Sequence, residues 1–141
     1  MFEKPTIKYT GSDYTSGIEE FYCLSEQQIR EFSGKINWHK LSIYQNLSES
    51  FTSEFPLKVD WEYVSMFQKL SEDFIRKFST RVFWPCISAH QVLSEDFIRE
   101  FSHKVYWRFI FTKQKLSKEF YSKFSDKYDF LVKKYGGIEN L

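Results

Sequence analysis

The sequence has little of what interrupts regular secondary structure, since only five of its 141 residues are Gly and three are Pro. Long structureless loops and extensive disorder are therefore not expected. Cysteine is scarce as well, because Cys23 and Cys86 are the only two and lie far apart in the sequence. Nothing in this spacing indicates a disulfide framework, and two unpaired thiols are typical of an intracellular protein.

Long hydrophobic runs are also missing, and no apolar stretch approaches the roughly 18 residues that a membrane-spanning helix needs. The opening segment MFEKPTIKYTGSDYTSG lacks the charged and then apolar layout of a signal peptide. We therefore expect a cytoplasmic protein that has no contact with a membrane. The formal net charge is only +1, which argues against a chain coated with basic groups for nucleic acid. The charge is uneven, however, because residues 103–141 carry 9 Lys and Arg against 4 Asp and Glu.

Aromatic residues are abundant, at 21% of the chain, and they belong to a repeat. Eleven of fifteen positions agree between LSEDFIRKFSTRVFW at Leu70 and LSEDFIREFSHKVYW at Leu93. The same 23-residue period holds the Leu-Ser pairs that begin at Leu24, Leu47, Leu70, Leu93 and Leu116. It also holds every tryptophan, at Trp38, Trp61, Trp84 and Trp107, with Phe130 in the fifth place. A repeat of this length indicates a stacked architecture.

Each repeat begins with the pattern of a helix start. In the first repeat Ser25 is a preferred N-cap, and the acidic Glu26 follows it in the first turn. Leu24 and Ile29 then occupy the N′ and N4 positions of a hydrophobic staple. The pattern predicts a first helix of about nine residues in each repeat.

The second half of a repeat follows the same logic. Asn37 is a good N-cap with Trp38 directly after it, and Ile36 and Leu41 form the second staple. Such short helices are marginal alone in water, so the repeats must bury their apolar side chains against one another. The sequence therefore predicts an all-α protein, an α-solenoid of about five 23-residue helix–turn–helix repeats.

The expected organisation is a single domain over residues 1–141. An N-terminal cap is predicted at 1–23 and a divergent C-terminal capping repeat at 116–141, where Gly136 and Gly137 indicate a helix end. The four regular repeats between them are 24–46, 47–69, 70–92 and 93–115.

The unit LSEDFIREFSxKVxW, completed by Gln, resembles the short helical repeats of uncharacterised proteins from giant viruses and bacteriophages. The resemblance covers about residues 24–130. It implies a helical-repeat fold and a viral or phage source, and so the cytoplasm of a host cell. Small viral proteins without catalytic residues are often inhibitors of host defence complexes, as anti-CRISPR proteins are. The resemblance carries no functional residues over to this chain.

Catalytic and metal-binding groups do not converge in the pattern. His39, His90 and His103 occupy three different repeat positions, and neither H-x-x-x-H nor C-x-x-C spacing occurs, so neither a metal nor a cofactor is expected. Cys86 and His90 are spaced i,i+4 and could touch, but nothing nearby supplies an orienting carboxylate or an oxyanion hole. The sequence therefore indicates a protein that is not an enzyme.

One basic residue recurs in every repeat, at Lys35, Lys58, Arg81, Lys104 and Lys127. The series could form a stripe of phosphate contacts. The interpretation we favour is structural, since each basic residue follows the end of a first helix and complements its negative pole. The tryptophans could likewise stack on bases, but their position beside the staple residues favours core packing.

Positions that differ between repeats are free to meet a partner. The second-helix N-cap changes from Asn37 and Asp60 to Phe83 and Tyr106, and Phe111 stands where three other repeats have Ser. Aromatic and Arg side chains are typical interface anchors. The predicted partner-binding residues are Phe83, His90, Tyr106, Arg108, Phe109, Phe111 and Lys113. We expect a module that docks on another protein or protein complex, with nucleic-acid binding through the basic residues as the alternative. Self-association through the same patch is also open.

Overall fold

The structure is a computed structural model that describes residues 22–137. The chain divides into two compact units, Met1–Gln68 and Lys69–Leu141. The boundary lies close to the end of the second regular repeat. The single domain over 1–141 stays a prediction. Apart from its last two residues, the predicted N-terminal cap lies outside the part of the chain that the structure describes.

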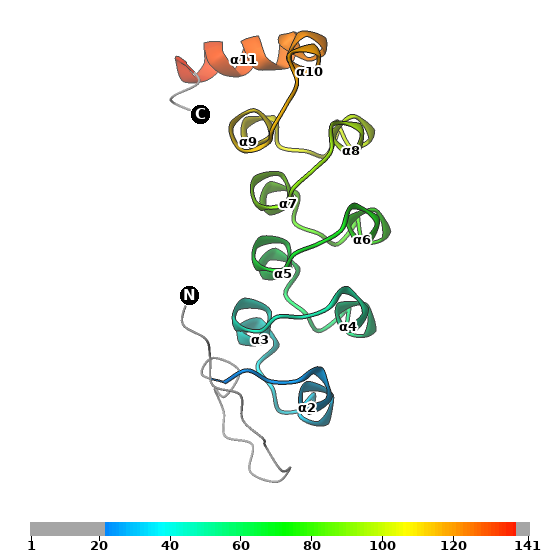
Figure 1. The fold of residues 1–141 in the computed structure, drawn as a ribbon. Coiled ribbons are helices and arrows are strands. Elements are labelled where there is room, and N and C mark those ends of the chain that lie inside the picture. Colours follow the sequence, from blue (N-terminus) through cyan, green and yellow to red (C-terminus); the bar gives the residue numbers. More distant parts are fainter. Residues whose placement is uncertain (1–21, 138–141) are drawn as a thin grey trace. The chain divides into compact units, whose positions relative to one another are not determined.

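The described residues form ten helices, so the predicted all-α class is confirmed. The first unit contains α2 (Glu26–Glu31), α3 (Trp38–Tyr44), α4 (Glu49–Glu54) and α5 (Trp61–Phe67). The second unit contains α6 (Glu72–Lys77), α7 (Trp84–His90), α8 (Glu95–Glu100), α9 (Trp107–Lys113), α10 (Lys118–Lys123) and α11 (Ser125–Tyr135). Within each unit the helix pairs follow one another as in a solenoid, with α3 against α5 and α7 against α9 (Figure 1).

The first helix of each repeat starts as predicted but is shorter. Ser25, Ser71 and their equivalents accept a hydrogen bond from the backbone N–H three residues on. The helices α2, α4, α6, α8 and α10 then last six residues rather than nine. In α2 the reason is a tight turn at Phe32, whose carbonyl accepts from the N–H groups of Lys35 and Ile36 at 2.8 and 3.0 Å. The turn buries Ile36 and leads the chain into the second helix.

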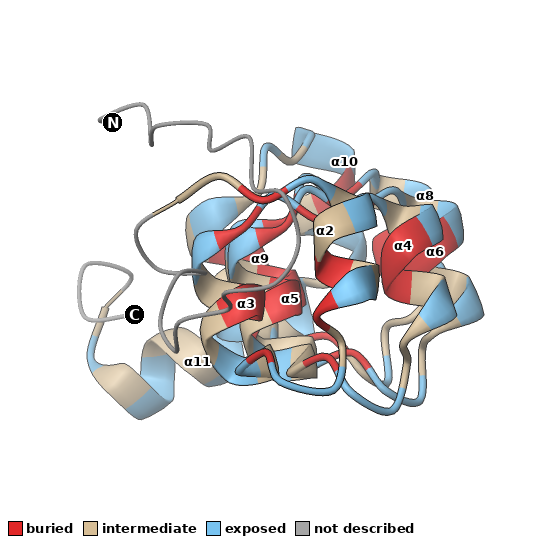
Figure 2. Cartoon of the chain, turned by 90° about the horizontal axis from the view of Figure 1, so that it is seen from below, coloured by how far each residue is buried: buried red, intermediate tan, exposed pale blue. Residues whose placement is uncertain are grey.

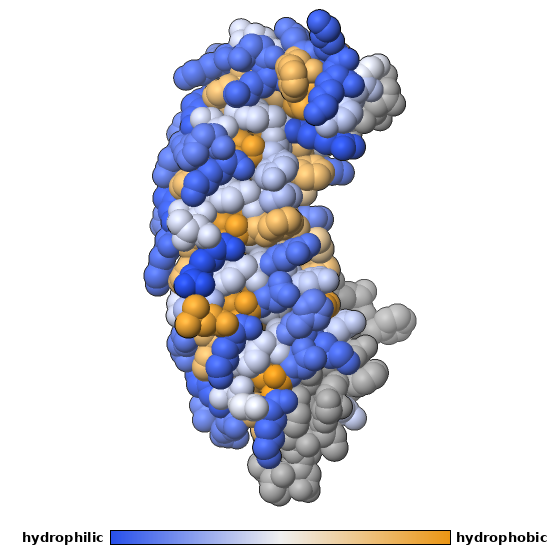
Figure 3. All heavy atoms as spheres, turned by 180° about the vertical axis from the view of Figure 1, so that it is seen from behind, coloured by the Kyte–Doolittle hydropathy of each residue, from blue (hydrophilic) through white to orange (hydrophobic). Residues whose placement is uncertain are grey.

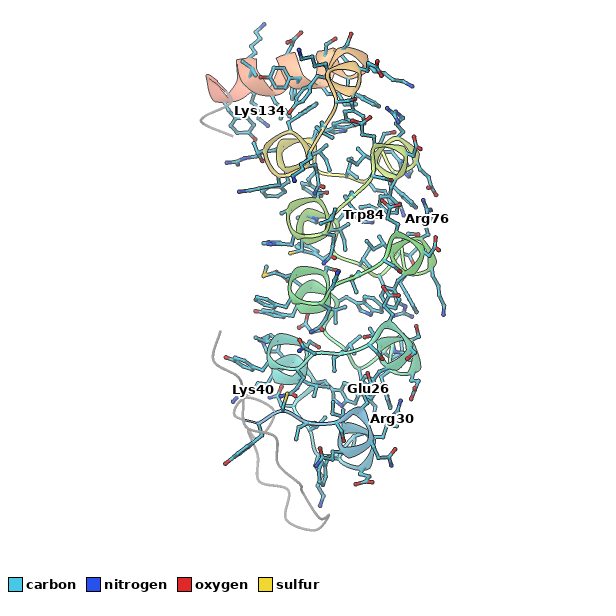
Figure 4. The ribbon with its side chains drawn as sticks, viewed as in Figure 1. Glu26, Arg30, Lys40, Arg76, Trp84 and Lys134 are labelled. Atoms are coloured by element: carbon cyan, nitrogen blue, oxygen red, sulfur yellow. The ribbon has the colours of Figure 1, made fainter. Side chains whose placement is uncertain are left out.

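Tryptophan begins the second helices α3, α5, α7 and α9, as the period predicts. Each indole nitrogen donates to the carbonyl five residues earlier, which for Trp84 is Ser79 at 3.0 Å. The Trp84 ring lies between α7 and α8, where it packs 5.0 Å from Phe101 and 6.3 Å from Phe97 (Figure 4). Trp84 therefore packs between the second helix of its own repeat and the first helix of the next repeat.

The core consists of the staple residues and of the phenylalanines at the third position of the first helices. Helices such as α3, α4 and α5 show buried residues on one side and exposed residues on the other (Figure 2). The side chains with no exposed surface include Ile29, Leu41, Phe51 and Val64 in the first unit, and Ile75, Ile87, Phe97, Ile98, Ile110 and Phe120 in the second. No buried side-chain nitrogen or oxygen of the described residues lacks a hydrogen-bond partner.

Within each unit, the recurring glutamine links one repeat to the one before it. Gln68 accepts a hydrogen bond from the Leu47 N–H at 2.9 Å and donates to the Gln45 carbonyl at 2.8 Å. In the second unit Gln114 repeats both contacts, with Leu93 at 3.1 Å and Gln91 at 2.8 Å. These amides satisfy the backbone groups where a second helix ends and the next repeat begins.

Charged side chains add a second set of contacts between the first helices. The Glu26 carboxylate accepts from the Ser48 N–H at 2.9 Å, and Glu95 accepts from the Ser117 N–H at 2.6 Å. Arg30 pairs with Glu54 of the next repeat at 2.7 Å, and this hydrogen bond lowers the pKa of the Glu54 carboxyl. Figure 4 labels Glu26 and Arg30 on α2.

The fifth repeat departs from the others in its second half. Helix α11 begins at Ser125, five residues before Phe130, and has eleven residues instead of seven. The buried Val of the turn is replaced by Tyr128, whose ring packs edge-on against Phe111 and Tyr121. The carbonyl of Phe124 accepts from the N–H groups of Lys127 and Tyr128 at 3.1 Å, as in the turns of the other repeats, but here the helix continues through these residues. Phe130 therefore does not take the tryptophan's place and is 63% exposed, whereas the expected helix end at Gly136 (φ 79°) is confirmed.

Candidate protein-docking surface

The N-cap residue of the second helix changes from polar to aromatic along the chain, while its backbone conformation stays the same. Asn37 and Asp60 accept hydrogen bonds from N–H groups of the helices that they precede. Phe83 and Tyr106 have no side-chain cap hydrogen bond, although their φ and ψ angles of −89° and 100° and of −90° and 98° match those of Asp60, −84° and 105°. The rings instead stand at the surface, 42% and 50% exposed.

The backbone beneath Tyr106 is held by a buried serine. The Ser88 hydroxyl accepts from the Tyr106 N–H at 3.0 Å and donates to the Trp84 carbonyl at 2.8 Å. In the first unit Ser42 makes the same bond to the Asp60 N–H at 3.0 Å. The aromatic ring is therefore presented from a fixed point, which reduces the entropy lost when a partner binds.

Two open grooves meet at Tyr106. One, of about 630 Å³, is lined by Tyr106, Arg108 and Phe109 together with Pro85 and two residues of α11, Leu131 and Tyr135. The other, of about 520 Å³, is lined by Phe83, Trp84, Pro85 and Tyr106 among others. We call the surface formed by Phe83, Pro85, Tyr106, Arg108, Phe109 and Tyr135 the Tyr106 face.

Arg108 is held on this face by an aromatic ring. Its guanidinium carbon lies 5.2 Å from the centre of the Tyr135 ring, so α11 contributes directly to the position of an α9 side chain. In the view of Figure 3, hydrophobic side chains appear as separate spots among hydrophilic ones. A concave site with aromatic walls and a positioned charge is typical of a binding surface.

The structure brings together four of the seven predicted partner-binding residues, Phe83, Tyr106, Arg108 and Phe109. His90 and Lys113 lie in the last turns of α7 and α9, away from these N-terminal ends, and line neither groove. Phe111 is only 4% exposed, because its ring packs against Tyr121 and Tyr128 at 5.5 and 5.2 Å. A partner cannot reach Phe111 while α10 and α11 are in place.

The sequence did not point to Pro85 and Tyr135 of the Tyr106 face, nor to Leu131, which lines the larger groove beside it. Pro85 is a departure from the repeat and could have been included on that ground. Leu131 and Tyr135 are spaced i,i+4 and share one side of a helix, but the early start of α11 decides which side that is.

The basic series is largely occupied by contacts within the chain. The ammonium groups of Lys58, Lys104 and Lys127 lie 5.4, 5.7 and 5.3 Å from the centres of the Trp38, Trp84 and Trp107 rings. Lys104 also donates to the Ser79 carbonyl at 3.2 Å. Ser79 follows α6, the first helix of the preceding repeat. Lys104 therefore contacts the end of that helix and not the end of α8, the first helix of its own repeat. Lys35 and Arg81 are exposed.

The other candidate groups do not form a site. Cys86 is buried and His90 is exposed, four residues apart on α7. Within residues 22–137 there is no cluster of three or more His, Cys, Asp or Glu side chains that could hold a metal ion. Over the same range, no helix is long and apolar enough to cross a membrane.

The fold and the repeat together define the class, an all-helical repeat protein built on a 23-residue unit. Comparison with known proteins takes the assignment no further, because no family model, no curated protein and no solved structure matches the chain.

Proposed function

We propose that this chain is a non-enzymatic helical-repeat module that docks on another protein through the Tyr106 face. The observation that carries the proposal is the replacement of two capping side chains by two exposed rings on an unchanged backbone. Both rings border open grooves, and Arg108 and Phe109 lie beside them.

The energetics of the two N-caps support this function. An Asn or Asp N-cap contributes about 0.5–2 kcal/mol relative to a residue that cannot cap. Phe83 and Tyr106 give up this contribution, and both rings remain about half exposed. An aromatic side chain that replaces a cap and keeps this much exposed surface is suited to bury it against a partner.

A module without catalytic groups acts by occupying a surface of its partner. Steric inhibition of a protein complex is the simplest effect of such binding. The viral or phage origin and the anti-CRISPR-like target that the repeat resemblance implies are part of this same proposal.

The test uses Tyr106→Asp in the full-length chain. Because Asp60 caps α5 from the same backbone conformation, Asp at position 106 should cap α9 and raise the free energy of unfolding by about 0.5–2 kcal/mol. The same change removes the central ring of the face. We therefore expect a more stable protein that no longer retains its partner in affinity capture from host extract, measured by quantitative mass spectrometry.

The matched control is Phe67→Ala, which removes a 52% exposed ring that lies outside the Tyr106 face, in the first unit. This variant should retain every partner of the unchanged chain. A partner that binds Tyr106→Asp as well as it binds the unchanged chain contradicts the proposal. The double variant Tyr106→Ala, Phe109→Ala should also lose the partner while its helical circular dichroism signal stays intact.

A further inference from the structure

The larger groove beside Tyr106 combines apolar walls with positive charge. Pro85, Phe109 and Leu131 supply apolar surface, while Lys104 and Arg108 supply two cations. Among residues 22–137, no Asp or Glu lines this groove. Residues 103–141, which furnish all of its lining except Pro85, carry a net charge of +5.

On the basis of the proposed function, we propose that the Tyr106 face binds an acidic linear segment of its partner protein. The segment carries an aromatic or long aliphatic side chain flanked by Asp or Glu. The apolar side chain enters the groove beside Phe109 and Leu131, and the carboxylates meet Arg108 and the positive field of Lys104.

Arginine suits this task because of how it is held. Its guanidinium carbon lies 5.2 Å from the centre of the Tyr135 ring, and the planar arrangement of N–H donors in a guanidinium suits recognition of a carboxylate. The contact with Tyr135 restricts the rotamers of the Arg108 side chain, so less conformational entropy is lost when a carboxylate binds.

Nucleic acid fits the observations less well than an acidic peptide. The ammonium groups of Lys104 and Lys127 lie over tryptophan rings, and Lys104 also donates to a carbonyl of its own chain. These cations contribute to the field, but they are not arranged as a row of outward phosphate contacts. The groove is concave and partly apolar, which suits a side chain better than a phosphate backbone.

Fluorescence anisotropy with labelled probes tests the inference on the full-length chain. The first probe is a short synthetic peptide with one Phe flanked by Asp and Glu. The second has the same sequence with Asn and Gln in place of the acids, and the third keeps the acids but has Ala for Phe. A single-stranded oligonucleotide of equal charge is the fourth. We expect the acidic Phe peptide to bind about tenfold more tightly than each of the others.

Arg108→Gln should weaken the acidic Phe peptide about three- to fivefold, the effect of one exposed ion pair, and should leave the neutral peptide unchanged. Lys115→Gln is the matched control, since Lys115 is exposed and lines neither groove, and it should have no effect. Equal binding of the neutral peptide, tighter binding of the oligonucleotide, or full affinity in Arg108→Gln overturns the inference. Failure of the acidic Phe peptide to bind at all does so too.

These outcomes are separable from a failure of the proposed function. If Tyr106→Asp loses the natural partner but the acidic peptide does not bind, docking stands and the acidic segment is wrong. If Tyr106→Asp keeps the natural partner, the proposed docking surface itself is wrong, whatever the peptides do.

Discussion

The side-chain amide of Gln68 donates a hydrogen bond to the backbone carbonyl of Gln45, 23 residues earlier, at 2.8 Å. The offset equals one repeat, and Gln114 makes the same bond to Gln91. The repeating side chain thus contacts the backbone of its own equivalent. Such a contact exists only when the repeats are stacked, so it links the stability of each repeat to that of its neighbour.

Gln68→Met should therefore destabilise the first unit. Met has a similar length and fills the space, but it cannot bond the Leu47 N–H or the Gln45 carbonyl. A buried backbone group left without a partner costs about 1–3 kcal/mol, and we expect a loss in this range or above it. Chemical denaturation followed by circular dichroism measures it. Gln27→Met, on the exposed side of α2, is the control, and an equal effect of both changes would contradict the role of Gln68.

Phe111→Ser restores the residue that the three preceding repeats have at this position, and we nevertheless expect it to destabilise the second unit. Phe111 is buried against Tyr121 and Tyr128, so its removal leaves a cavity beneath α10 and α11. Loss of a buried Phe side chain costs about 3–5 kcal/mol. Thermal unfolding checks this expectation. Tyr121→Phe keeps the ring and should be nearly neutral, and a similarly neutral Phe111→Ser would show that the cluster contributes little.

Much of the fold was predictable because each repeat has its own local signals. Ser25 and Asn37 cap their helices as expected, and the staple residues Leu24, Ile29 and Leu41 are buried. These features depend on residues only a few positions apart, so spacing alone is enough to predict them.

Contacts between repeats were not predictable in the same way. The Lys104 ammonium lies over Trp84, 20 residues before it, and that partner follows from how the repeats stack rather than from local spacing. The early start of α11 is a second case, because Phe124 in front of it makes no side-chain cap hydrogen bond that would mark the start. Of the candidate site, the exposed N-cap rings could be predicted, whereas Leu131 and Tyr135 depend on how α11 packs against α9.

Acid should weaken the second unit through Glu95. The hydrogen bond from the Ser117 backbone N–H is the main reason that the pKa of Glu95 lies below its ordinary value of 4.5, and the Ser117 side chain and Arg99 act in the same direction. Because folding lowers this pKa, the ionised carboxyl stabilises the fold above pH 4.5, and the contribution is lost as the pH falls through the folded-state pKa.

Glu95→Gln should therefore lower the melting temperature at neutral pH, and the difference from the unchanged chain should shrink well below pH 4.5. Thermal melts across this range measure the effect. Glu119→Gln, an exposed carboxylate in the first turn of α10, is the control. A difference for Glu95→Gln that is the same at both ends of the range would contradict the role of its ionised form.

The arginine of the fourth repeat, Arg99, lacks an inter-repeat partner that Arg30 and Arg76 have, and that partner can be restored. Arg30 pairs with Glu54 and Arg76 with Glu100, in both cases 24 residues on (Figure 4 labels both arginines). The residue 24 positions after Arg99 is Lys123, and Arg99 pairs instead with Glu95 and Asp96 on its own helix. Arg99 therefore makes no such pair with α10.

Lys123→Glu should place a carboxylate where Glu54 and Glu100 stand and so raise the melting temperature slightly, since exposed ion pairs contribute little individually. Lys123→Gln separates the new pair from the mere loss of a positive charge beside Arg99, and it should be less stable than Lys123→Glu. High salt should narrow the gap between the two variants because it screens an exposed pair. If the two variants melt together at low salt, Arg99 does not reach position 123, and α10 packs on α8 differently from the way α8 packs on α6.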